Sequence, residues 1–168
     1  MQKTISTAIL FLLLCSFKGG TQAFVSKQYG FSLEVPKSYE IQKDYGEMIP
    51  VMIYTATEGS ADDFRENINV VVQPFEGDLD TYYLAYIAGM PRVMQDFKLL
   101  KQTTKKVNGL SAHYMIYTFT YNQQTIQGLA YVFAFGGNGF VITCSSTPTS
   151  FNRYQTAFEA VAQSFKKL

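Results

Sequence analysis

VNGLSAHYMIYTFTYNQQTIQGLAYVFAFGGNGFVITCSSTPTSFN, residues 107–152, is a stretch of 46 residues without Asp, Glu, Lys or Arg. Charged residues make up 16% of the sequence, so roughly seven would be expected in a segment of this length. The stretch contains three runs rich in β-branched and aromatic residues, Ser111–Tyr121, Thr125–Phe135 and Phe140–Ser145, divided by short loops of Asn, Gln and Gly. This pattern predicts three successive antiparallel strands.

Apolar side chains occupy both alternating positions of the first run. Tyr114 and Ile116 alternate with Met115, Tyr117 and Phe119, whereas a sheet with one solvent-facing side would alternate apolar and polar residues. We therefore expect this sheet to be covered on both faces, at least in part. The stretch is then the buried scaffold, and a functional site is to be sought outside it.

The first 23 residues resemble a secretory signal peptide. Lys3 supplies a basic start, Ile5–Leu14 an apolar core of about ten residues, and Thr21–Ala23 a small-x-small ending. We expect cleavage between Ala23 and Phe24. The apolar core is too short for a lone transmembrane helix, which needs about 20 residues, so the mature chain is expected to be exported and to contain no transmembrane helix.

Lipidation of Cys15 is an alternative to cleavage after Ala23, because this cysteine directly follows the apolar core. The residue before it is Leu14, where lipoprotein sites normally have a small residue. Either route predicts a protein of the periplasm or cell envelope, free or lipid-anchored. Cleavage after Ala23 would leave Cys144 as the single cysteine, which excludes an internal disulfide. Its position in an apolar strand predicts that it is buried.

The composition fits one globular domain that does not bind nucleic acid. A chain of 168 residues, with 47% hydrophobic and 15% aromatic residues, can bury a sizeable core. Removal of Lys3 and Lys18 with the signal peptide leaves 12 basic and 13 acidic residues. Neither sign dominates, so the charge balance gives no reason to expect a nucleic-acid partner.

Further strands are predicted outside the uncharged stretch, at Tyr29–Pro36, Tyr39–Lys43, Val51–Thr57, Asn67–Phe75 and Lys98–Val107. The last of them carries four lysines, which could bind an anionic partner. Edge strands also use lysine to block unwanted pairing, and we prefer this structural interpretation. Asn108-Gly109 predicts a tight turn into the next strand. The acidic segment Glu58–Glu66 is expected to be a surface loop, because its spacing matches no calcium loop.

Two amphipathic helices are predicted. From Leu79 to Phe97 apolar residues recur at steps of three and four, and Asp78 or Asp80 can cap the start. Pro91 is expected to kink this helix or to divide it near Gly89.

The second helix is expected after Thr147-Pro148, with an apolar stripe that includes Phe158 and Phe165 and an end at Lys166-Lys167. Both stripes would pack on the sheet. The sequence therefore predicts a single α+β domain over residues 24–168, an antiparallel β-sheet flanked by helices.

No catalytic, metal or cofactor site is predicted. The single histidine, His113, could serve Cys144 as a base, but nothing in the sequence fixes their separation and no third orienting residue is evident. One histidine and one mature cysteine cannot supply the four ligands of a structural zinc site. Gly136–Gly139 lacks the lysine and the following helix of a phosphate-binding loop, and is expected to be a hairpin turn.

A series of strand and turn motifs supports a family assignment. They are Tyr29–Leu33 with Val35-Pro36, Glu66–Val70, the helix Leu79–Phe97, the Asn108-Gly109 hairpin, and Ser164-Phe165 in the closing helix. In this order they resemble the PsbP/Mog1-like superfamily, in particular its bacterial DUF1795 or DcrB-like proteins. The resemblance covers nearly all of residues 24–168. Tyr39 departs from the pattern, because the family often has Trp a few residues after the opening proline.

The resemblance implies a Mog1/PsbP-like sandwich and a binding or assembly role without catalysis. The superfamily includes lumenal accessory subunits of photosystem II, envelope lipoproteins, GTPase-binding proteins and chaperones for secreted effectors. A signal peptide argues against the last two roles, which belong to the cytosol or nucleus. Such fold analogy is a weak argument for function.

Three functions are therefore considered. The first is an exported, non-enzymatic envelope protein that binds an unknown protein partner or stabilises a membrane-associated complex. The alternative is a small-ligand or lipid carrier, with a pocket between the sheet and the helix that carries Tyr82, Tyr83 and Tyr86. The third is an effector chaperone of the DUF1795 type.

Overall fold

The computed structural model of the chain describes residues 19–57, 59 and 64–168. Its first strands are β1 (Thr21–Ser26), β2 (Phe31–Pro36), β3 (Glu40–Gly46), β4 (Ile49–Tyr54) and β5 (Asn67–Pro74). After them come α1 (Leu79–Val93), β6 (Gln95–Val107), β7 (Leu110–Tyr121), β8 (Gln124–Phe135), β9 (Asn138–Ser146), α2 (Pro148–Gln163) and β10 (Lys166–Lys167). Cys15, the apolar core of the predicted signal and most of the predicted acidic loop lie outside the described residues.

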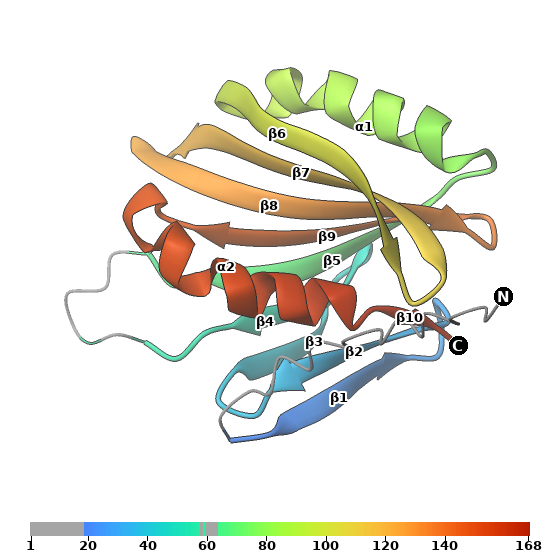
Figure 1. The fold of residues 1–168 in the computed structure, drawn as a ribbon, viewed down its shortest axis with the longest axis horizontal. Helices are drawn as coiled ribbons and strands as arrows, with labels where there is room; N and C mark the ends of the chain where they lie inside the picture. Colours follow the sequence, from blue (N-terminus) through green and yellow to red (C-terminus); the bar gives the residue numbers. More distant parts are fainter. Residues whose placement is uncertain (1–18, 58, 60–63) are drawn as a thin grey trace, which may run out of the picture.

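The strands form two antiparallel sheets (Figure 1). Seven strands form the larger sheet in the order β3-β4-β5-β9-β8-β7-β6, and three form the smaller one in the order β1-β2-β10. The uncharged stretch supplies β7, β8 and β9, which pair as neighbours in the larger sheet. The three strands predicted from it are thus confirmed, and β5 joins them on the side of β9.

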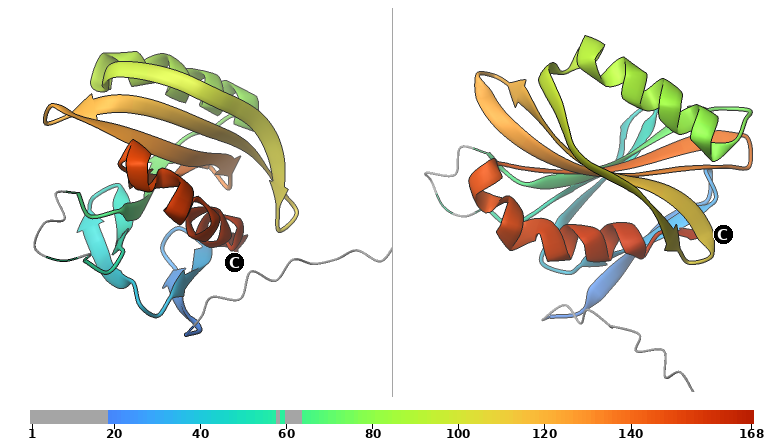
Figure 2. Two further views of the ribbon diagram at one scale, coloured as in Figure 1. Left: turned by 60° about the vertical axis from the view of Figure 1, so that its left-hand side comes forward. Right: turned by 45° about the horizontal axis from the view of Figure 1, so that its top comes forward.

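The two helices cover opposite faces of the seven-stranded sheet (Figures 1 and 2). On one face, Tyr82, Tyr83 and Met90 of α1 share a buried cluster with Met115 and Tyr117 of β7. On the other face, α2 and the small sheet together close a larger cluster, which includes Phe31, Leu33, Tyr114, Phe133, Phe140, Phe158 and Phe165. The predicted α+β sandwich, with a sheet covered on both faces, is confirmed.

Helix α1 is shorter than the sequence predicts. Asp78 caps its start, where the carboxylate accepts from the Thr81 backbone N–H at 2.7 Å. Pro91 lies in the last turn, and the helix ends at Val93. Phe97 belongs to β6. The apolar stripe continues past the helix because α1 and the first residues of β6 contribute to the same buried cluster, so periodicity alone could not locate the end.

Helix α2 also ends before the predicted position. It stops at Gln163, and Lys166–Lys167 form β10 instead of its last turn. Lys166 pairs with Ser32 of β2, and the Leu168 N–H donates to the Gly30 carbonyl oxygen at 2.9 Å. The chain leaves the helix because the free edge of β2 provides hydrogen-bond partners for its backbone. The local sequence around Lys166–Lys167 does not indicate this pairing.

Strand β1 contains the residues on both sides of the predicted signal cleavage. Thr21 pairs with Pro36, and its hydroxyl donates to Glu34 Oε2 at 2.9 Å. The Gln22 side-chain amide donates to the Tyr39 carbonyl oxygen at 3.0 Å. The domain in the structure therefore includes residues before position 24, the start expected from the sequence.

A chain that begins at Phe24 is expected to be less stable than one that begins at Gly20. It loses half of β1 with the side-chain bonds of Thr21 and Gln22, which should lower the free energy of unfolding by about 1–2 kcal/mol. Urea unfolding of the two purified versions measures this difference. Equal midpoints would show that the first half of β1 contributes nothing to stability.

Candidate functional site

His113 and Cys144 lie on opposite faces of the larger sheet. The His113 ring stacks on Tyr83 of α1, with 4.0 Å between ring centroids, whereas Cys144 belongs to the cluster beneath α2. Burial, and then the charge of Glu159, raises the pKa of the Cys144 thiol far above its usual range. The pair therefore cannot act as a nucleophile and base.

His113 instead belongs to a polar group between α1 and β6. Its Nε2 lies 2.7 Å from Asp80 Oδ1, and the Tyr83 hydroxyl donates to Gln102 Oε1 at 2.8 Å. Beside this group lies a pocket of about 280 Å³, lined by Tyr83, Gln102, Thr103, Thr104 and His113. Sequence reasoning treated Asp80 only as a possible helix cap. Its contact with His113, 33 positions away, has no local signal.

A second polar group joins β6 to α2. Lys105 Nζ lies 3.1 Å from Glu159 Oε2 and donates to the Tyr131 hydroxyl at 3.1 Å. The Tyr114 hydroxyl donates to Glu159 Oε1 at 3.0 Å, and Lys105 Nζ lies 4.0 Å from the centroid of the Tyr114 ring. The side-chain amide of Gln163 also donates to Glu159. Each charge is thus paired and hydrogen-bonded, so the arrangement holds α2 on the sheet.

The two charged groups of this network have shifted pKa values. Burial alone would raise the pKa of Glu159, but hydrogen bonds from Gln155 and Lys105, the charge of Lys105 and a hydrogen bond from Tyr114 outweigh it and lower the pKa. Burial alone would lower the pKa of Lys105, but hydrogen bonding and charge interactions with Tyr131 and Glu159 raise it. Both shifts favour the charged pair in the folded state.

Glu159→Gln is expected to lower the free energy of unfolding by about 1 kcal/mol at pH 7. The folded-state pKa of Glu159 lies below its ordinary value of 4.5, so its contribution is complete above that value and is lost as pH falls through the folded pKa. The difference between wild type and variant should therefore shrink below about pH 4.5. Urea unfolding from pH 3 to 7 tests this, with the exposed Glu76→Gln as control. A difference that does not vary with pH would contradict the assignment.

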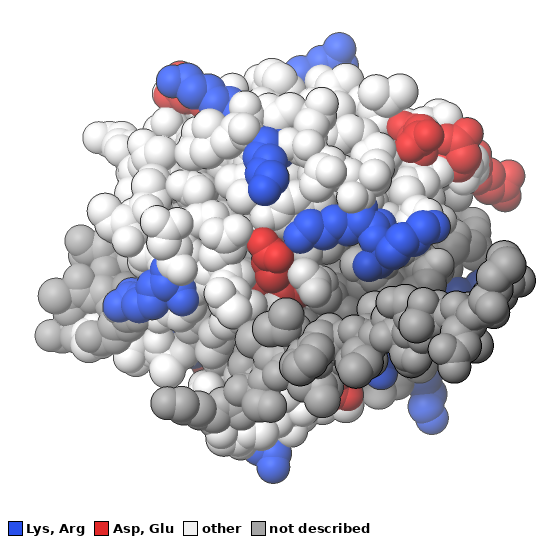
Figure 3. Space-filling view, viewed as in Figure 1, with Lys and Arg blue, Asp and Glu red and all other residues white. Residues whose placement is uncertain are grey.

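β6 is an edge strand of the larger sheet, as the lysine-rich sequence predicts. It is 13 residues long and pairs with β7 along one side, while no strand among the described residues pairs with its other side. Its residues are exposed except for Phe97, Lys105 and Val107. Figure 3 shows basic groups spread over this side of the molecule with an acidic group among them.

A pocket of about 420 Å³ lies beside α1, lined by Met48, Gln73, Pro74, Phe75, Tyr82, Ala85 and Tyr86. It is at the border of the helix and the sheet, where the carrier hypothesis predicts a cavity. Beneath the pocket, α1 packs closely on β9, because a side chain at Gly139 would overlap the Tyr82 ring. Burial raises the pKa of Tyr86 to about 12. The pocket is therefore a surface hollow beside the helix, and Tyr83 faces the other pocket, near β6.

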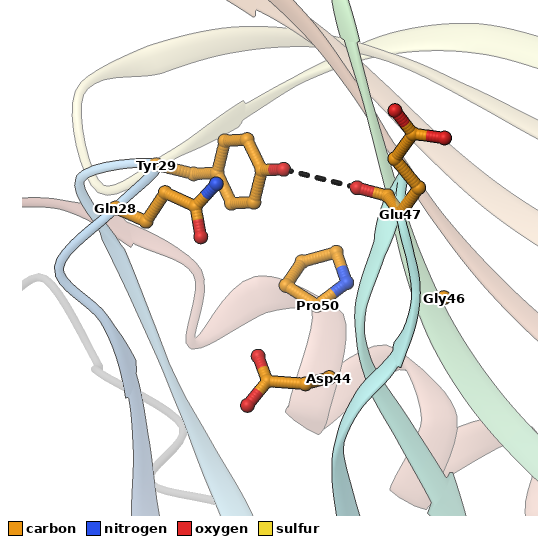
Figure 4. Close-up of a pocket in the computed structure, with 6 residues that line it drawn as sticks. All are labelled: Gln28, Tyr29, Asp44, Gly46, Glu47 and Pro50. Carbon is orange, nitrogen blue, oxygen red and sulfur yellow. Dashed lines mark hydrogen bonds between the residues drawn. The ribbon is translucent and has the colours of Figure 1, made fainter.

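Figure 4 shows a third pocket, of about 430 Å³, between the β1–β2 turn and the β3–β4 hairpin. Tyr29 closes one side, and its hydroxyl donates to the Glu47 carbonyl oxygen at 3.2 Å. Asp44 and Glu47 are among its lining residues, and the Glu47 carboxylate points away from the hollow. Within residues 19–57, 59 and 64–168, no three His, Cys, Asp or Glu residues are grouped so that they could hold a metal ion. Among the described residues this pocket therefore has no ligand set for a metal.

Glu66, at the end of the predicted acidic loop, is not a surface residue. It is 3% exposed, and one of its carboxylate oxygens accepts from the Ser150 hydroxyl in the first turn of α2. A carboxylate at a helix N-terminus is stabilised by the helix dipole. Glu66 therefore anchors the start of α2.

None of the helices in the described part of the chain is long and apolar enough to cross a membrane.

Comparison with known proteins identifies relatives of this fold. The sequence profile of the DcrB family matches residues 32–164. A search of curated proteins finds no match. Among solved structures, cyanobacterial PsbP (CyanoP) from Synechocystis sp. PCC 6803 superimposes with a TM-score of 0.67 at 14% identity, over 90% of this chain and 95% of that chain.

Two further solved structures are similar. The protein of unknown function PA94 from Pseudomonas aeruginosa, a putative regulator by its description, has a TM-score of 0.61 at 15% identity, over 86% of this chain and 95% of that chain. LpqN, described as involved in cell envelope biogenesis of Mycobacterium tuberculosis, has a TM-score of 0.60 at 14% identity, over 87% of this chain and 90% of that chain. At these identities the likeness establishes the fold.

Proposed function

Because the chain belongs to the DcrB family, we propose that it is an exported, non-enzymatic protein of the cell envelope that binds a protein partner or stabilises a membrane-associated complex. The signal-like N-terminus supports export. LpqN, which shares the fold, is described as involved in cell envelope biogenesis. The chain also shares its fold with cyanobacterial PsbP (CyanoP).

The observation that most favours a binding role is the free edge of β6. A strand of 13 residues that is exposed along most of its length offers unpaired backbone N–H and C=O groups to another chain. By contrast, the residues that could supply a nucleophile and a base, Cys144 and His113, are separated by the sheet. Recognition by surface contacts therefore fits the molecule better than catalysis.

Crosslinking in the cells that produce the chain tests this proposal. After denaturing purification, we expect a second protein to be attached reproducibly, and an unrelated exported protein serves as the control for abundance. A chain that is recovered alone at every crosslinker length would overturn the proposal. Mass measurement of the mature chain in the same preparation distinguishes cleavage after Ala23 from lipidation at Cys15.

The second candidate function is a carrier of a small apolar ligand, which the pocket beside α1 favours. Its volume of about 420 Å³ lies in the range of ligand pockets, and Met48, Phe75 and Tyr82 give it an apolar and aromatic lining. Organic extraction of the chain purified from its own cells should then release one bound compound. Ala85→Trp should abolish this binding by filling the pocket, whereas Leu84→Trp, on the exposed side of the helix, should not.

A further inference from the structure

We propose that the partner binds through an extended, acidic segment that adds as a strand to the free edge of β6, with one of its side chains in the pocket between β6 and α1. This inference rests on the proposed function and specifies where and what the chain binds.

Three of the four lysines of β6 lie on one face of the sheet, whereas Lys106, which pairs with Ser111, lies on the other. Lys98, Lys101 and Lys105 pair with Thr118, Ile116 and Ala112 of β7, which are separated by even numbers of residues and therefore share a face. Ile116 and Ala112 belong to the cluster beneath α2, so this lysine row is on the α2 face. In a regular strand, residues three positions apart, such as Lys98 and Lys101, lie on opposite faces of the sheet. The β-bulge between Leu99 and Lys101 inserts one extra residue, which brings Lys98 and Lys101 onto the same face.

Only one of these three lysines is neutralised within the described chain. Lys105 pairs with Glu159, whereas Lys98 and Lys101 form no ion pair with the described residues. An added strand would place every second side chain on this face, beside the two lysines. Carboxylates at these positions would be attracted, and lysine or arginine would be repelled. The edge therefore selects an acidic segment.

The opposite face of β6 offers a pocket at the same level. Gln102 and Thr104 pair with Met115 and His113 of β7, and they line the pocket of about 280 Å³ together with Thr103, Tyr83 and His113. Strand addition derives its specificity from pockets that accept alternate side chains. The partner segment should therefore alternate carboxylates toward α2 with a side chain that enters this pocket toward α1.

A second copy of the chain fits this edge less well. Antiparallel pairing of two β6 strands would bring two lysine rows onto one continuous sheet, and like charges across a strand pair are destabilising. Lysine on an edge also discourages indiscriminate pairing. An acidic segment removes that penalty, so the same residues both protect the edge and select its partner.

The test places a photoreactive phenylalanine derivative in the full chain, in place of Thr103 on β6 or of Gln42 on β3, the opposite edge of the sheet. Cells that produce each version are irradiated, and the attached peptide is sequenced by mass spectrometry. We expect adducts from position 103 and few from position 42. The captured segment should contain acidic residues at alternate positions.

Charge reversal then tests the role of the lysines. Lys98→Glu together with Lys101→Glu should reduce the adduct from position 103 about tenfold. Lys43→Glu, on β3, should leave it unchanged. Adducts that arise elsewhere but not at position 103, a captured segment without acidic residues, or insensitivity to the double reversal would overturn the inference and leave the proposed function standing. If no adduct forms at position 103 and the chain is also recovered alone in the crosslinking experiment described above, both the inference and the proposed function are overturned.

Discussion

Phe165→Ala is expected to lower the free energy of unfolding by about 3–5 kcal/mol. Phe165 is fully buried, and its ring centroid lies 4.6 Å from that of Phe133 and 5.3 Å from that of Phe31. It follows α2 directly and precedes β10, so its ring lies where the helix, the small sheet and the large sheet meet. Truncation would leave a cavity that these three elements cannot close without moving apart.

Urea unfolding of the purified variant measures this loss. Leu168→Ala is the matched control, because Leu168 is 62% exposed in the same C-terminal segment, and it should change stability by less than about 0.5 kcal/mol. A loss below about 1 kcal/mol for Phe165→Ala would mean that the small sheet does not depend on this ring.

Gly128→Ala is expected to have the second largest effect, a loss of about 3 kcal/mol. A Cβ atom at Gly128 would lie 2.7 Å from Cε2 of Tyr117, on the neighbouring strand β7. The Tyr117 side chain is fully buried beneath α1, so the ring cannot turn away into solvent. Either the ring or the backbone of β8 must shift, and both are held by packed neighbours.

Gly89→Ala provides the opposite control for the same substitution. Gly89 lies within α1, and a Cβ atom there would meet nothing within 4 Å apart from the helix's own backbone and its chain neighbours. Alanine should therefore stabilise the helix by about 0.5–1 kcal/mol. If both variants unfold at the same urea concentration, the close packing of Tyr117 on Gly128 is not a source of stability.

The strands of the uncharged stretch were predictable because their signal is local. β-Branched and aromatic runs, with Asn and Gly between them, specify β7, β8 and β9 without reference to the rest of the chain. The burial of Cys144 followed from the same pattern, and Asn108-Gly109 correctly predicted the turn before β7. The edge position of β6 was predictable from its lysines.

Other features depend on contacts between distant residues and were not predictable. The two-residue strand β10 exists because β2 has a free edge, and Lys166-Lys167 alone resemble a helix end. Lys105 and Glu159 are 54 positions apart, so their pairing follows from the position of α2 on the sheet. The pocket beside β6 likewise requires knowledge that Tyr83 of α1 lies over His113.

The surface of β6 links the stability of the fold to its proposed role. Lys105 holds α2 in place through Glu159, while Lys98 and Lys101 remain available on the same face. One strand thus carries a lysine that stabilises the fold and two lysines that we propose for recognition. Substitutions should distinguish the two roles. Loss of the Lys105 side chain should lower the stability of the fold, whereas charge reversal of Lys98 and Lys101 should weaken partner binding.

Native mass measurement of the chain, purified at low salt from the cells that produce it, tests whether the chain binds a protein partner. Low salt is needed because a complex that depends on exposed charges weakens as ionic strength rises. We expect a complex with the mass of the mature chain plus a second polypeptide, which dissociates when salt is raised. A mass equal to the chain alone, or to the chain plus a small molecule of a few hundred daltons, would contradict it.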